Sequence, residues 1–102
     1  MAESAREFFE SLPTRVDADK TAGMSNTYLF DIEGAGKWKV DVRDGKVSVS
    51  EGGEDADAVI STTQETFEKI AGGEQNPTSA YMTGKLKVRG DMGAAMKLQK
   101  LF

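Results

Sequence analysis

Hydrophobic residues recur with helical spacing near the N-terminus and alternate with polar residues in the segments that follow. Phe8, Phe9 and Leu12 fall on one face of a helix, and this spacing predicts a helix near the N-terminus. The chain has the Ser-x-x-Glu pattern of a capping box from Ser4, so we expect the helix to begin there. Pro13 should end or kink it near Leu12, because proline lacks the backbone N–H.

Four segments in the first two thirds of the chain have strand-like patterns. Residues 37–43 and 46–50 alternate polar and apolar positions, which predicts two half-buried strands. The Asp-Gly pair between them is a strong hairpin signal, because both turn positions favour positive φ. Residues 27–32 and 58–62 are rich in aromatic and branched side chains. We expect these four strands to form an antiparallel meander with one apolar and one hydrated face.

The hydrophobic period becomes helical again in the last third of the chain. Thr63 is a typical N-cap residue, and Phe67 and Ile70 mark the buried stripe of the helix that it begins. Pro77 is typical of the first turn of another short helix. Residues 86–89 predict a fifth strand, and Asp91 then has the residue type of an N-cap for a closing helix.

Strands flanked by helices indicate an α+β fold with the helices on one face of the sheet. The chain of 102 residues, with 38% hydrophobic and 29% charged residues, is typical of a single soluble domain spanning residues 1–102. We expect Trp38, the only tryptophan, to lie in its core. The sequence has no run of about 20 apolar residues and no signal-peptide core. Its last residues are not a Ser-Lys-Leu signal, so we expect a cytoplasmic protein.

The chain contains neither cysteine nor histidine, which excludes most catalytic and metal-binding arrangements. It has no thiolate nucleophile, no serine–histidine triad and no ordinary zinc site. Residues 90–93 have the letters of a GXXG nucleic-acid loop, but Asp91 would repel phosphate, so we expect no nucleic acid. The acidic loop at 51–57 lacks the ligand periodicity of a calcium loop. We therefore expect no metal, no cofactor and no catalytic residue.

Charge is divided unevenly along the chain. Residues 1–83 carry 8 basic and 16 acidic side chains, whereas residues 84–102 carry 5 basic side chains and one acidic side chain. Lys85, Lys87 and Arg89 could contact an anionic membrane or an acidic partner transiently. The alternative interpretation is an ordinary solvated strand face.

A cluster of flexible apolar residues near the C-terminus is the strongest candidate for a binding site. Met82, Met92 and Met96 lie close in sequence to Tyr81, and Gln99 follows on the same helical face as the last two. Methionine lines surfaces that must accommodate variable apolar partners. These residues either fill the core or line an apolar cavity, with Gln99 as its polar contact and the closing helix as its lid.

An ordered set of residues along most of the chain closely resembles the type-2 sterol carrier protein family. The run GKLKVRGDMGAAMKLQKLF, residues 84–102, is the most specific part of this resemblance. The early Phe8-Phe9 helix, Trp38 and the hairpin signal before Lys46 also fall where the family has similar residues.

This resemblance implies a five-stranded, mostly antiparallel sheet with helices on one face that enclose an apolar tunnel. It also implies non-catalytic binding and transfer of an apolar lipid, such as a fatty acid, an acyl-CoA or a sterol-like molecule. The tunnel walls of the family correspond in this sequence to Phe67, Ile70, Tyr81, Met82, Leu86, Met92 and Met96, with Gln99 as a polar contact. The alternative function is an interaction module whose cavity has collapsed and whose basic C-terminal segment docks on a protein or an anionic membrane.

Overall fold

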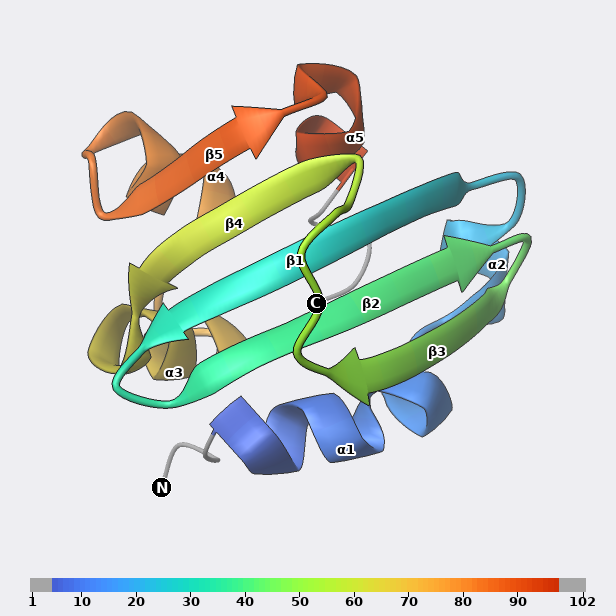
Figure 1. Ribbon diagram of the computed structural model, residues 1–102, viewed down its shortest axis with the longest axis horizontal. Helices are drawn as coiled ribbons and strands as arrows, with labels where there is room; N and C mark the ends of the chain where they lie inside the picture. The colour runs from blue at the N-terminus through green and yellow to red at the C-terminus, as the bar shows by residue number, and fades with distance from the viewer. Residues whose placement is uncertain (1–4, 98–102) are drawn as a thin grey trace.

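The computed structural model describes residues 5–97, and residues 1–4 and 98–102 lie outside this description. Five strands and five helices follow one another along the described chain (Figure 1). Their bounds are α1 Ala5–Arg15, α2 Ala18–Thr21, β1 Ser25–Glu33, β2 Gly36–Arg43, β3 Lys46–Glu51, β4 Ala58–Thr63, α3 Gln64–Ala71, α4 Pro77–Met82, β5 Leu86–Gly90 and α5 Met92–Met96. No helix in this part of the chain is long and apolar enough to cross a membrane.

The five strands form one sheet in the order β3-β2-β1-β4-β5. Every neighbouring pair is antiparallel except β1 and β4, which are parallel, with Phe30 beside Ile60. The predicted α+β fold with a mostly antiparallel sheet and helices on one face is therefore confirmed (Figure 1). The predicted meander of four strands is wrong, because β4 pairs with β1 and not with β3.

The segment between β3 and β4 explains this difference. It crosses the face of the sheet that the helices leave open, passing over β2 and β1 before β4 begins (Figure 1). A Cβ atom on Gly53 would lie 3.4 Å from the Cβ of Lys39 and 3.7 Å from Cδ1 of Leu29. The crossing segment thus covers Leu29, which is only 4% exposed although it points away from the helices. Because the segment runs across β2 and β1, β4 begins beyond β1 and pairs with it on the side away from β2.

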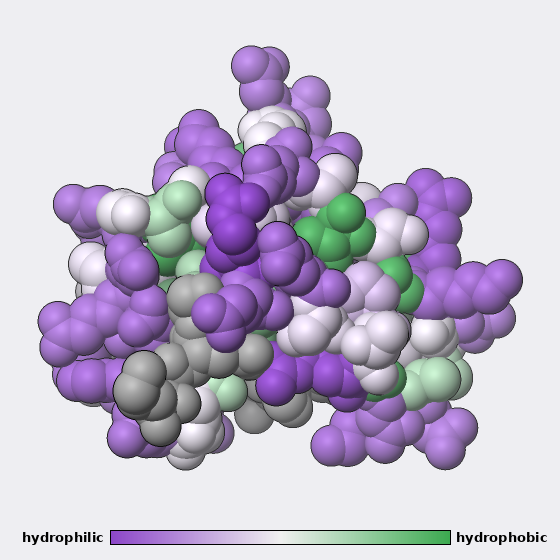
Figure 2. All heavy atoms as spheres, turned by 90° about the horizontal axis from the view of Figure 1, so that it is seen from below, coloured by the Kyte–Doolittle hydropathy of each residue, from purple (hydrophilic) through white to green (hydrophobic). Residues whose placement is uncertain are grey.

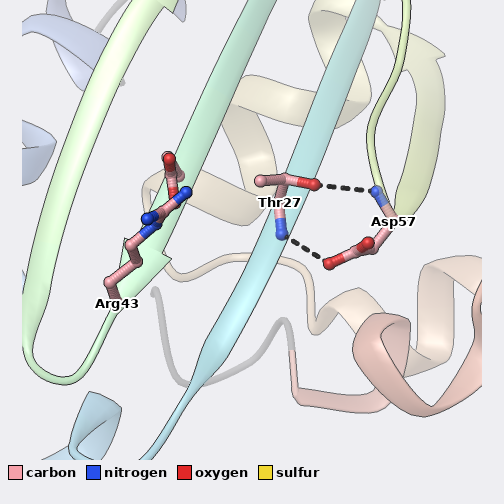
Figure 3. Close-up of polar contacts among 4 residues, drawn as sticks. Thr27, Arg43 and Asp57 are labelled. Carbon is pink, nitrogen blue, oxygen red and sulfur yellow. Dashed lines mark hydrogen bonds and ion pairs between the residues drawn. The ribbon is translucent and has the colours of Figure 1, made fainter.

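A reciprocal pair of hydrogen bonds fixes the end of this crossing. The backbone N–H of Thr27 donates to Oδ2 of Asp57 at 3.0 Å, and the N–H of Asp57 donates to Oγ1 of Thr27 at 2.9 Å (Figure 3). The carbonyl of Asp57 accepts a hydrogen bond of 2.7 Å from the N–H of Asp91. Gly90 is required beside it, because a Cβ there would lie 2.5 Å from that carbonyl oxygen. One residue therefore joins β1, β4 and the start of α5.

The helices cover one face of the sheet and enclose an aromatic core between them. Phe9 of α1 stacks on Trp38 with ring centroids 4.8 Å apart and on Phe67 of α3 at 5.1 Å. Phe30 packs against the same Phe9 ring at 5.1 Å. Trp38 is 3% exposed, so its predicted place in the core is confirmed.

Helix α1 differs from its prediction at its C-terminal end. Pro13 lies inside the helix, which continues to Arg15, so an end near Leu12 is wrong and a kink there stays a prediction. Phe9 and Leu12 are completely buried against the sheet, and their packing holds the last turn even though proline removes one backbone donor. The predicted cap at Ser4 lies outside the described residues.

The local turn and cap predictions in the described chain are confirmed. Asp44 and Gly45 have φ angles of 45° and 85°, as the predicted hairpin requires. The side chain of Thr63 accepts a hydrogen bond from the N–H of Thr66 at the start of α3. Asn76, which was not predicted as a cap, accepts from two N–H groups at the start of α4, directly before Pro77.

Candidate functional site

An apolar groove with a volume of about 370 Å³ lies between α4, β5 and α5, at one edge of the sheet. Its walls are made by the two short helices and its floor by the inward side chains of β5. The lining residues are Pro77, Thr78, Tyr81, Met82, Leu86, Val88, Met92, Ala95 and Met96. Within this lining, the only polar side-chain groups are the hydroxyls of the threonine and the tyrosine.

The turn between α4 and β5 holds the first wall in place. The N–H of Lys85 donates to the carbonyl of Ala80 at 2.9 Å, which closes the C-terminal end of α4. The hydroxyl of Thr62, a buried residue of β4, donates to the carbonyl of Lys85 at 2.8 Å. These bonds set α4 beside β5, so that Tyr81 and Met82 face the same space as Leu86.

Helix α5 forms the second wall. Oδ1 of Asp91 accepts hydrogen bonds from two N–H groups that lack helical partners, at 2.8 and 3.2 Å, and so caps the helix as predicted. Met92, Ala95 and Met96 have the spacing of one helix face and line the groove, whereas Ala94 is buried toward the sheet.

The large hydrophobic side chains that solvent reaches are concentrated at this groove. In the described part of the chain, the exposed large hydrophobic residues are Tyr81 at 43%, Met82 at 78%, Met92 at 44% and Met96 at 76%. The opposite side, which carries α1 and β3, is mostly hydrophilic (Figure 2). A contiguous exposed apolar patch of this kind marks a site of interaction or ligand binding.

The structure brings together most of the predicted site residues and separates two of them. Tyr81, Met82, Leu86, Met92 and Met96 all line the groove. Phe67 and Ile70 are instead buried in the core, at 1% and 4% exposure, and do not line it. Gln99 and the rest of the predicted lid lie outside the described residues. The tunnel itself remains a prediction, because the space between α4 and α5 is a groove that reaches the surface.

Four lining residues were not predicted from the sequence. Val88 follows Leu86 with strand spacing, and Ala95 follows Met92 with helical spacing, so periodicity alone could have identified both. The sequence predicts only that Pro77 begins the first turn of a helix, and it singles out no role for Thr78. Nothing in the local sequence shows that this turn lies beside β5.

The basic side chains of β5, those of Lys87 and Arg89, lie on the face of the strand turned away from the groove, and Lys85 directly precedes the strand. Lys85, Lys87 and Arg89 are exposed, and Lys87 stands in register with Ser61, which is itself in register with Asp31 of β1. Lys85 and Lys87 border a shallow polar hollow together with Asp31 and Glu33. Part of the basic charge therefore has acidic neighbours on the open face of the sheet.

Tyr28 is a buried titratable group that reaches the wall of the groove. It is completely buried on β1, and its hydroxyl donates to the carbonyl of Ala94 at 2.5 Å. Burial raises its pKa to about 12, and the negative charges of Asp57 and Asp91 add to this effect. The phenol is therefore protonated at neutral pH and acts as a hydrogen-bond donor to α5.

This raised pKa predicts a loss of stability at alkaline pH. An unfolded tyrosine has a pKa of about 10, so the stability that depends on the protonated phenol is present below pH 10 and is lost as the pH rises toward 12. Above both pKa values, the free energy of unfolding should have fallen by roughly 3 kcal/mol. Urea unfolding from pH 8 to 12 should show the free energy of unfolding of the wild type falling more than that of Tyr28→Phe, which lacks the phenol. Equal pH dependence in the two proteins would contradict the assignment.

The fold and the groove define a class of small α+β domains with an apolar site at one edge of the sheet. A family model described as the SCP-2 sterol transfer family matches residues 7–102. The chain therefore belongs to this family, and the resemblance seen in its sequence is confirmed. Membership in this family supports lipid binding and transfer as its general function.

Known relatives and solved structures match most of this chain. Hydroxysteroid dehydrogenase-like protein 2 of Xenopus tropicalis is 36% identical over 94% of this chain, which spans only 24% of that protein. The sec-alkylsulfatase Pisa1 from a Pseudomonas species is 26% identical, with a TM-score of 0.79, over 93% of this chain and 16% of its own. A solution structure of palmitated SCP2L2 from Aedes aegypti has the same fold, with 23% identity and a TM-score of 0.78 over 97% of this chain and 94% of its own. The chain thus spans about a quarter of the relative from Xenopus.

Proposed function

We propose that residues 1–102 form a single lipid-binding domain, which holds the apolar part of a lipid in the groove between α4, β5 and α5 and passes it on without catalysis. The observation that carries this proposal is the groove itself, because its lining is almost entirely apolar and its volume of about 370 Å³ is that of a ligand site. A fatty acid, an acyl-CoA or a sterol-like molecule would each bring an apolar part of suitable chemistry.

Burial of apolar surface is the driving force that the groove offers. Ten methylene groups transferred from water into it would contribute about 8 kcal/mol before the costs of association are subtracted. The flexible side chains of Met82, Met92 and Met96 can adapt to chains of different shape. We therefore expect loose selectivity among lipids.

The lining supports binding rather than chemistry. Its polar side-chain groups are the hydroxyls of Thr78 and Tyr81, and the chain contains no histidine or cysteine that could activate either of them. The hydroxyls are suited to orienting a ligand by hydrogen bonds.

Palmitate is a suitable first probe, because a protein with this fold has been studied in a palmitated form. Delipidated protein should take up one palmitate per chain in native mass spectrometry, and palmitate should displace a fluorescent fatty acid from it. Absence of uptake of both molecules would overturn the proposal. The alternative function, an interaction module with a collapsed cavity, predicts that result.

The basic face of β5 supports a second role in docking on an anionic membrane. Lys85, Lys87 and Arg89 are exposed on the side of β5 that is turned away from the groove, and a cationic side chain near an anionic surface contributes about 1 kcal/mol. Reversing all three to glutamate should abolish salt-sensitive binding to vesicles that contain phosphatidylserine, while palmitate uptake is retained. Loss of both activities would show that the two sites are not separate.

A further inference from the structure

Helix α5 is short, and two attachments from distant parts of the chain hold it on the sheet. It contains only Met92–Met96, so its own backbone hydrogen bonds contribute little to its position. Within the helix only Ala94 is buried, and both of its methionines are exposed at the groove. Among residues 5–97, the hydrogen bonds that reach this wall from the sheet come from β1 and from the residue before β4.

The first attachment is the hydroxyl of Tyr28. This residue stands in the middle of the sheet, between Val40 of β2 and Ala58 of β4. Its hydroxyl donates to the carbonyl of Ala94, which lies in the last turn of α5. The carbonyl also accepts from the N–H of Lys97. A rigid ring thus sets the height of α5 above the sheet.

The second attachment is at the beginning of α5. The N–H of Asp91 donates to the carbonyl of Asp57 at 2.7 Å, and Asp57 is itself fixed to Thr27 by two hydrogen bonds (Figure 3). Thr27 and Tyr28 are neighbours on β1. The two attachments therefore start from adjacent residues of the central strand.

We propose that Tyr28 is a positioning residue for the lipid site, whose bond to Ala94 controls how readily α5 moves away from β5 to let a ligand enter or leave. This proposal rests on the lipid-binding function proposed above. It follows from the geometry because the turn at Lys85 joins α4 directly to β5 and accepts a bond from Thr62. Helix α5 buries a single residue, as α4 does, but within the described chain its hydrogen bonds to β1 and to the residue before β4 are those at Ala94 and Asp91. Tyr28 is not one of the residues that line the groove, so it acts on the ligand through α5.

Tyr28→Phe removes only the hydroxyl and keeps the ring in the core. A typical hydrogen bond corresponds to a change of roughly two- to tenfold in an opening equilibrium. Amide hydrogen exchange at Ala94 to Lys97 should therefore become faster by about this factor. Stopped-flow release of a fluorescent fatty acid should accelerate by a similar factor, and uptake should accelerate with it, so that the affinity changes less than either rate.

Thr21→Val is the matched control. It also removes a buried hydroxyl that donates to backbone carbonyls, those of Asp17 and Ala18, but it lies in α2, away from the groove. It should leave exchange in α5 and the fatty-acid rates unchanged. A second variant, Thr27→Val, weakens the other attachment by removing the acceptor for the N–H of Asp57 and should accelerate both processes in the same direction.

The outcomes separate this proposal from the function on which it rests. Hydrogen exchange is measured without lipid, so faster exchange confined to α5 supports the attachment independently of any ligand. Unchanged exchange in α5, an equal increase across β1 and β4, or unaltered fatty-acid rates with faster α5 exchange would each overturn the role of Tyr28. Failure of the wild type to take up any fatty acid would instead overturn the proposed function.

Discussion

Replacing Phe67 with alanine should cost about 3–5 kcal/mol of the free energy of unfolding, which is a large part of the total for a domain of this size. The ring packs against Phe8 at 5.3 Å and Phe9 at 5.1 Å, and it is only 1% exposed. Its removal leaves a cavity that neighbouring rings cannot fill without moving. Urea unfolding followed by the fluorescence of Trp38 would measure the loss.

The comparison with Tyr81→Ala decides between core and site. Tyr81 lines the groove and is 43% exposed, so its loss should change stability little and weaken fatty-acid binding. Phe67→Leu should recover much of the stability lost in Phe67→Ala. If Phe67→Ala instead left stability intact and altered lipid uptake, Phe67 would be a wall of the ligand site, as the sequence resemblance implied.

A double replacement, Met92→Glu with Met96→Glu, should remove palmitate uptake while the fold persists. Both side chains are substantially exposed, at 44% and 76%, so the charges remain hydrated in the free protein and stability should change by about 0.5 kcal/mol per site or less. A bound apolar chain would strip water from these carboxylates. Each should therefore weaken binding by at least roughly tenfold, about 1.4 kcal/mol.

A charge-matched control keeps this experiment interpretable. Ser48→Glu with Ser50→Glu adds the same two charges on exposed positions of β3, at the opposite edge of the sheet from β5. It should leave palmitate uptake unchanged in native mass spectrometry and in displacement of a fluorescent fatty acid. Unimpaired uptake by the methionine variant would show that lipid does not bind in this groove.

The crossing segment between β3 and β4 links the fold to the site. It carries the chain over Leu29 and ends at Asp57, whose backbone carbonyl holds the start of α5. The same residues that make β4 parallel to β1 therefore also position one wall of the groove. A sequence interpretation that placed β4 beside β3 could not have found this connection.

The sequence by itself determined the local elements of this protein. Alternation marked β2 and β3, the Asp-Gly pair at Asp44 fixed their hairpin, and Thr63 and Asp91 identified two helix starts. Each of these signals depends on residues within a few positions of one another, so short-range geometry is sufficient to interpret it. The ordered residues of the last third also indicated the family, because their order along the chain is itself the family's pattern.

Only the tertiary structure decided which of the apolar residues form the core and which form the groove. Phe67 and Met82 are both apolar residues of helical segments, yet Phe67 meets the rings from α1 and β1, whereas Met82 faces the space beside β5. Met82 faces that space because β5 lies at the edge of the sheet, and the other wall of the groove is held by the bond from Tyr28 to Ala94, across 66 residues of sequence. Contacts between segments so far apart in the chain leave no periodic pattern in either segment, because each side chain's neighbours are set by packing and not by its place in the sequence.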